Sequence, residues 1–152
     1  MTKFVDNIVP AALMGVAVSF LGIGALIRNV GDVAWLLTNQ AQVAMALILA
    51  SSSLLAGSYL GMKAKSEFVN NGIELGFLIA FVELTLIFPL FQSFIGNWSL
   101  SVVNAFGGLA ILDVVAAFAG ALLGMLPGYF VRERVYKHLP EGMFGQKSKV
   151  DS

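Results

Sequence analysis

Two carboxyl side chains, those of Glu83 and Asp113, lie deep inside long apolar stretches of this 152-residue chain. An ionised carboxylate at the centre of a bilayer costs about 2.5–3.5 kcal/mol on insertion scales, so such residues usually face a partner, a cavity or an ion path. Two buried acids in contact cannot both ionise cheaply, and a shared proton or a bound cation such as Na⁺ resolves the conflict. Glu83 and Asp113 are therefore the candidate proton- or cation-binding residues.

Pro89 adds a further source of oxygen ligands close to Glu83. A proline inside a helix has no backbone N–H, so the carbonyl four residues earlier, that of Thr85, loses its partner. This carbonyl and the Thr85 hydroxyl lie within one turn of Glu83. Interrupted helices beside midmembrane sites recur in ion-coupled transporters. We therefore expect a helix kink at Pro89 and assign Thr85 to the ion or proton site.

A structural role for the two acids is the alternative. A protonated carboxyl group can act as a neutral hydrogen-bond donor between helices, for example to Ser51, Ser52 or Ser53. Such bonds contribute about 0.6–2 kcal/mol in membranes. An acid can also pair with a cation on another subunit, which would make it part of an assembly.

Four apolar segments carry these residues, and a helical span needs about 20 mostly apolar residues. The chain is 58% hydrophobic and only 12% charged, against about 25% charged in soluble domains. The predicted spans cover about 9–27, 41–62, 73–95 and 102–131. The sequence therefore predicts an all-α, multi-pass protein of the cell membrane: a four-helix transmembrane domain over 1–137, followed by a polar cytoplasmic tail over 138–152.

The basic residues predict the orientation of the spans. They precede the first span, occupy the connection between the second and third, and follow the fourth; they include Lys3, Lys63, Lys65, Arg132 and Arg134. The connection at 96–101 has no charge. Since basic loops stay in the cytoplasm, we expect both termini to be cytoplasmic.

The two acids also match in depth. Glu83 lies about 12 residues before the end of the third span and Asp113 about 11 after the start of the fourth, so both lie roughly 16–18 Å from that end. If these antiparallel helices are neighbours, the two carboxyl groups can meet near the midplane.

Small residues recur every four positions on several spans, a spacing that lets helices pack closely in lipid. The fourth span has Ala116, Gly120, Gly124 and Gly128; the second has Ser53, Gly57 and Gly61; and the first has Ala11, Gly15 and Ser19. These stripes predict either packing within one chain or an interface between subunits. For the fourth span the two interpretations have equal support.

The segment 65–94 (KSEFVNNGIELGFLIAFVELTLIFPLFQSF) resembles part of the proteolipid c/K subunits of rotary ATPases. In that family a polar cytoplasmic loop precedes a helix with a midmembrane glutamate, followed by a branched and an aromatic residue, as in Glu83, Ile87 and Phe88. The resemblance implies that Glu83 suits reversible protonation. Two departures are that Pro89 replaces the usual glycine and that the preceding span lacks dense glycines.

Other function classes find no support in the composition. The chain has no cysteine, its single histidine (His138) lies in the polar tail, and its nine basic and nine acidic residues balance. We therefore expect no catalytic residues, cofactor, metal or nucleic acid. The predicted function is to bind or translocate a proton, cation or small solute, with the lipid bilayer and a homo-oligomer or larger complex as partners. The alternative is a non-catalytic structural or assembly subunit, with a proteolipid-like role as one variant.

Overall fold

The computed structural model describes residues 7–30, 35, 38–63, 68–90 and 100–136, and within these it contains helices and no strand. The elements are α1 (Val9–Val30), α3 (Asn39–Lys63), α4 (Phe68–Val82), the π-helical turn η2 (Glu83–Ile87) and α6 (Leu100–Tyr136). In this part of the chain four segments are long and apolar enough to cross a membrane: Val9–Asn29, Asn39–Lys63, Val69–Leu90 and Gly107–Arg134. The predicted all-α architecture with four spans is confirmed.

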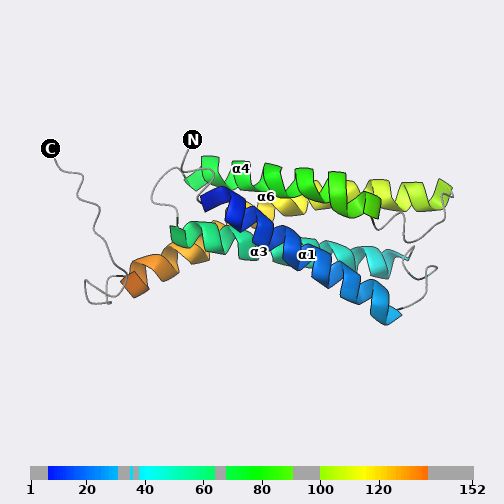
Figure 1. Ribbon diagram of the computed structural model, residues 1–152, viewed down its shortest axis with the longest axis horizontal. Coiled ribbons are helices and arrows are strands. Elements are labelled where there is room, and N and C mark those ends of the chain that lie inside the picture. The colour runs from blue at the N-terminus through cyan, green and yellow to red at the C-terminus, as the bar shows by residue number, and fades with distance from the viewer. Residues whose placement is uncertain (1–6, 31–34, 36–37, 64–67, 91–99, 137–152) are drawn as a thin grey trace.

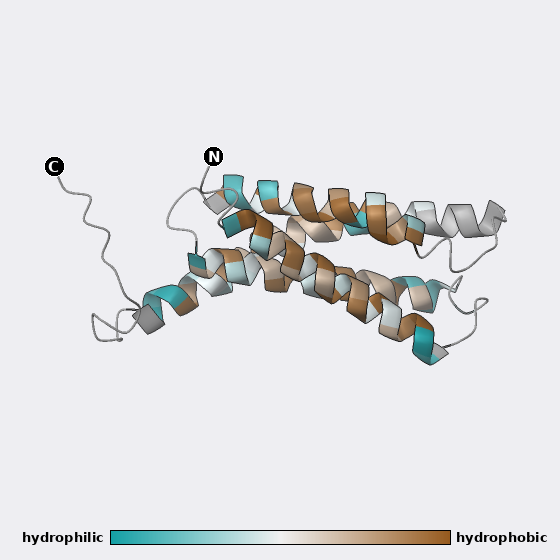
Figure 2. Ribbon diagram, in the orientation of Figure 1, coloured by the Kyte–Doolittle hydropathy of each residue, from teal (hydrophilic) through white to brown (hydrophobic). Residues whose placement is uncertain are grey.

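The boundaries of the helices differ modestly from the prediction. The third span begins earlier than residue 73, and its predicted end at 95 lies outside the described residues. The last helix extends beyond the predicted end at 131 to Tyr136, while the predicted tail over 138–152 also lies outside them. Hydrophobic residues predominate along the middle of the helices, and hydrophilic ones are more frequent toward the coloured ends (Figure 2). This distribution fits a hydrocarbon solvent around the bundle.

The helices form a bundle in which each packs against two main neighbours (Figure 1). α3 packs against α1 and α6, and α4 packs against the same two helices from the other side. The start of α1 and the end of α6 lie at the same end of the bundle. α3 and α6 run parallel, since Gly57 meets Ala121 and Gly61 meets Met125.

Glycines bring the backbones of α3 and α6 into direct contact. A β-carbon added to Gly57 would collide with the carbonyl oxygen of Ala121, and one added to Gly124 would collide with that of Leu54. The same holds for Gly61 and Gly128, while Gly120 packs against the side chain of Ser53. Ala116, the first residue of the predicted stripe, is only half-buried. The two stripes therefore pack against each other within one chain.

Two apolar clusters fill the bundle. The first cluster contains Ile8, Ala11, Ala12, Ala56, Leu60, Leu75, Ile79, Ala80, Ala117, Ala121 and Met125. The second contains Ile23, Ala41, Met45, Leu49, Ile87, Phe88 and Leu109. All four spans contribute to both clusters, so a region between them crosses every helix.

Candidate functional site

Four polar residues, one from each span, occupy this region between the apolar clusters. They are Ser19 on α1, Ser52 on α3, Glu83 at the start of η2 and Asp113 on α6, and each has an exposed fraction of 0%. We call these four residues the polar layer. On every helix the polar residue lies between a member of one cluster and a member of the other, so apolar side chains border the layer on both sides.

Ser19 is the centre of the hydrogen bonding in the polar layer. Its Oγ lies 2.7 Å from Ser52 Oγ and 3.1 Å from the carbonyl oxygen of Gly15. It also donates a hydrogen bond to Oε1 of Glu83. Ser52 Oγ in turn lies 2.7 Å from the carbonyl oxygen of Leu49. A continuous set of hydrogen bonds therefore links α3, through α1, to Glu83.

The side chains of Glu83 and Asp113 lie within hydrogen-bonding reach of each other. A carboxylate has no hydrogen to donate, so their approach becomes a hydrogen bond only when one group carries a proton. Glu83 Oε2 and both carboxyl oxygens of Asp113 have no donor among the described residues. Buried oxygens without donors are costly. The pair is therefore suited to accept a proton or another positive charge.

The chain between Glu83 and Pro89 departs from regular α-helix. The backbone N–H of Phe88 donates to the carbonyl oxygen of Glu83, five residues earlier, which defines the wide turn η2. Such π-turns inside α-helices are rare and often coincide with functional sites. The wide turn ends at Ile87, two residues before Pro89, and the kink expected at Pro89 itself stays a prediction.

Thr85 does not join the polar layer. Its side chain is exposed, and its hydroxyl donates to the carbonyl oxygen of Phe81 at 2.6 Å. Two residues apart on a helix point to nearly opposite sides, so a buried Glu83 places Thr85 on the outer surface. The Thr85 hydroxyl therefore contacts its own helix, away from the buried acids.

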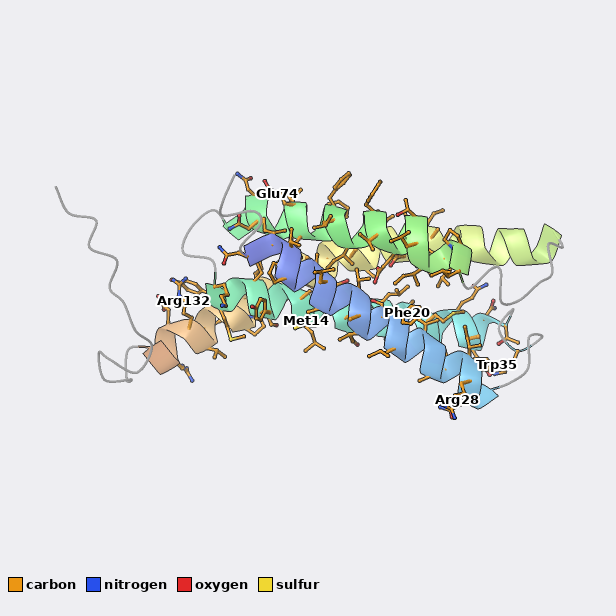
Figure 3. All side chains as sticks on the ribbon, viewed as in Figure 1. Met14, Phe20, Arg28, Trp35, Glu74 and Arg132 are labelled. Atoms are coloured by element: carbon orange, nitrogen blue, oxygen red, sulfur yellow. The ribbon has the colours of Figure 1, made fainter. Side chains whose placement is uncertain are left out.

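Among the described residues, no basic side chain lies in the polar layer. The buried polar side chains there are the four of the layer and Ser53. Charged residues lie toward the ends of the bundle: Figure 3 places Glu74 and Arg132 toward one end and Arg28 at the other. Among the described residues, no three His, Cys, Asp or Glu side chains gather into a metal site. Within the polar layer, therefore, no basic side chain of the described residues balances the charge of an ionised acid.

The three candidate serines of the second span separate in the structure. Ser51 is exposed and donates to the carbonyl oxygen of Leu47 at 2.7 Å. Ser52 reaches the acids indirectly, through Ser19. Ser53 is buried against Gly120, and its hydroxyl has no partner among the described residues.

The sequence did not point to Ser19 as a hydrogen-bond partner of the acids, because a serine at this position was interpreted only as a small packing residue. Its position held a signal: it lies in the middle of the first span, at a depth comparable to that of the two acids. A polar residue at matching depth on each span is a pattern that a sequence can reveal.

Comparisons of this chain with protein-family models, with curated proteins and with solved structures find no match. The likeness of segment 65–94 to proteolipid subunits therefore stays a local one.

Proposed function

We propose that this protein binds a proton at the Glu83–Asp113 pair and translocates it across the cell membrane, with both termini in the cytoplasm. The observation that supports the proposal is the pair itself: two fully buried carboxyl groups on neighbouring helices, with three oxygens that have no donor among the described residues. Acids at midmembrane depth mark ion pathways and proton relays in membrane proteins.

A proton suits this site better than a divalent metal cation. Hard divalent cations such as Ca²⁺ take six to eight oxygen ligands, as a rule of thumb. The polar layer offers the four carboxyl oxygens and the hydroxyl of Ser19, while the hydroxyl of Ser52 contacts Ser19 rather than the acids. A single proton between two carboxyl oxygens needs only those two oxygens.

The apolar borders of the polar layer suggest how translocation is controlled. The two clusters pack against the layer from both sides, and all four of its side chains are fully buried. Such packing supports an occluded binding site, reached from one side of the membrane at a time, rather than an open aqueous pore. A homo-oligomer or larger complex would form through surfaces other than the α3–α6 glycine contact, which is occupied within the chain.

Proton flux into liposomes tests the proposal. Purified protein is reconstituted, a membrane potential is imposed, and internal pH is followed with a trapped dye. We expect wild type to conduct protons, and Glu83→Gln and Asp113→Asn to reduce the flux to that of empty liposomes. Glu74→Gln is the matched control, because Glu74 is an exposed acid on the same span. Wild-type flux equal to that of empty liposomes would refute the proposal.

The second candidate is a non-catalytic subunit that needs the acids only for folding. It is favoured by the fact that hydrogen bonds of the polar layer link three of the four spans, through Ser52, Ser19 and Glu83, as a structural network would. This candidate predicts no proton flux, together with purification from native membranes in a larger complex whose mass native mass spectrometry reports.

A further inference from the structure

The two serines of the polar layer have a property that the proposed function does not use. Each hydroxyl has one hydrogen and more than one acceptor within reach. Ser19 can donate to Glu83, to Ser52 or to the carbonyl oxygen of Gly15, and Ser52 can donate to Ser19 or to the carbonyl oxygen of Leu49. The hydrogens can therefore be arranged in more than one way without moving a heavy atom.

Two arrangements satisfy every hydroxyl. When Glu83 is ionised, Ser52 donates to Ser19 and Ser19 donates to Oε1 of Glu83. When Oε1 carries a proton, Glu83 donates to Ser19, Ser19 donates to Ser52, and Ser52 donates to the carbonyl oxygen of Leu49. The second arrangement is the reverse of the first, and the Leu49 carbonyl accepts the last hydrogen.

A hydroxyl chain that reverses in this way has the geometry of a proton relay. We propose that Ser19 and Ser52 form the relay that connects Glu83 to one side of the membrane, at the edge of the bundle where α1 packs on α3. The proposal rests on the proposed function and names its route. Ser19 and Ser52 carry the proton in transit, whereas the carboxyl pair stores it.

Within the described part of the chain, hydroxyl groups contact the carboxyl pair at one place only. Glu83 Oε2 and both oxygens of Asp113 have no donor there, so Oε1 of Glu83 is the atom of the pair that connects to a hydroxyl. Asp113 therefore lies at the closed end of the hydrogen-bond chain, and Ser52 at the end from which protons arrive.

Each transfer balances without a further reactant. Ser52 is fully buried, so α1 and α3 must part to admit a hydrated proton. That proton then protonates Ser52 Oγ, the original hydrogen of Ser52 passes to Ser19 Oγ, and the original hydrogen of Ser19 passes to Glu83 Oε1. Each serine breaks one O–H bond and forms one, and the net change is a water molecule and a protonated Glu83. Release runs the same steps backwards.

The test is the rate at which the Glu83 carboxyl proton exchanges with solvent. Infrared spectroscopy of the protein in nanodiscs reports the carbonyl stretch of a protonated carboxyl group, assigned to Glu83 by its loss in Glu83→Gln. Transfer into D₂O then shifts this band at the exchange rate. We expect Ser19→Ala and Ser52→Ala to slow the exchange on the order of 10²-fold, the low end of what a positioned proton-transfer group contributes.

Ser51→Ala is the matched control, since Ser51 neighbours Ser52 but is exposed and bonds only its own helix, at Leu47. Its exchange rate should equal that of wild type. Ser19→Cys keeps a γ atom, slightly larger than the oxygen it replaces, while weakening the donor, so it should slow exchange without leaving the gap that Ser19→Ala leaves. Helicity measured by circular dichroism verifies that the variants are folded.

The outcomes separate the relay from a merely structural role and from the proposed function. If the serines only hold the helices together, their removal loosens the bundle and exchange becomes faster, which overturns the relay. Unchanged exchange in folded Ser19→Ala and Ser52→Ala also overturns it, even where proton flux is intact. Slowed exchange in a protein without proton flux supports the relay and refutes the proposed function alone.

Discussion

The polar layer and the α3–α6 glycine contact are two buried regions of the bundle that are built on opposite principles. At the glycine contact the backbones touch, and no β-carbon fits at Gly57 or Gly124. In the polar layer the side chains fill the space, yet three carboxyl oxygens have no donor among the described residues. The glycine contact is stabilised by close packing, whereas the polar layer leaves carboxyl oxygens without hydrogen-bond donors.

This difference assigns a packing role to the glycine contact and accords with the proton site proposed for the polar layer. Helices in lipid associate mainly through close packing, because the hydrocarbon around them is as apolar as their side chains. The glycine contact provides such packing between α3 and α6. The polar layer costs free energy until a proton or a cation binds, and natural proteins tolerate that cost chiefly at functional sites.

Adding one methyl group to the glycine contact should produce the largest effect. In Gly124→Ala the new β-carbon meets the Leu54 carbonyl oxygen, so we expect the free energy of unfolding to fall by about 1–3 kcal/mol or more. Gly24→Ala is the control, because a β-carbon added there meets no atom within 4 Å, and it should gain up to about 1 kcal/mol. Unfolding in mixed detergent, followed by circular dichroism, measures both. Equal stability of the two variants would contradict the assigned contact.

Supplying a missing hydrogen-bond donor in the polar layer should instead raise the free energy of unfolding. In Asp113→Asn the amide nitrogen can donate to Oε2 of Glu83, which has no donor among the described residues, so we expect the free energy of unfolding to rise by about 1–2 kcal/mol. The same variant should lose proton flux, which separates stability from function. Glu74→Gln, measured in the same unfolding assay, provides the reference. A destabilised Asp113→Asn would mean that the layer is already satisfied.

Neighbouring serines on α3 offer a finer comparison within the second span. Ser52→Ala removes a hydroxyl that hydrogen-bonds Ser19, and it should lower the free energy of unfolding by about 1 kcal/mol. Ser53→Ala removes a buried hydroxyl without a partner among the described residues, so it should be neutral or stabilising by up to about 1 kcal/mol. Thermal unfolding of the two variants, side by side, decides the point. An equal loss in both would show that Ser53 has a partner.

The smallest effect is expected at Thr85. Thr85→Val keeps the shape of an exposed side chain and removes only a bond to its own helix, at Phe81. We expect a change in stability below about 0.5 kcal/mol, and proton flux equal to that of wild type. Flux lost in this variant would restore Thr85 to the ion or proton site.

Much of the fold follows from the sequence because hydropathy reports the solvent around each segment. The four spans and the common depth of Glu83 and Asp113 follow from length, apolar content and helical rise. The small-residue stripes also predict close contacts, but their spacing does not name the partner, since a glycine packs equally well against its own chain or another. Only the packing of α3 on α6 resolved that choice.

The candidate site shows where sequence reasoning stopped. The two acids were found because charge is conspicuous in an apolar span, whereas Ser19 was missed because a serine there also serves as a small residue. Thr85 was assigned by its nearness along the chain to Glu83, and helix geometry places it on the other side.

By itself, the sequence determined that this protein crosses the membrane four times and places two acids near the midplane, because burial in lipid demands apolar helices of set length. The tertiary structure alone decided that Ser19, Ser52, Glu83 and Asp113 meet in one layer, and that the glycine stripes face each other. The reason is physical. Hydropathy acts on each helix separately, whereas neighbour order depends on the fit between helix surfaces, which no single span encodes.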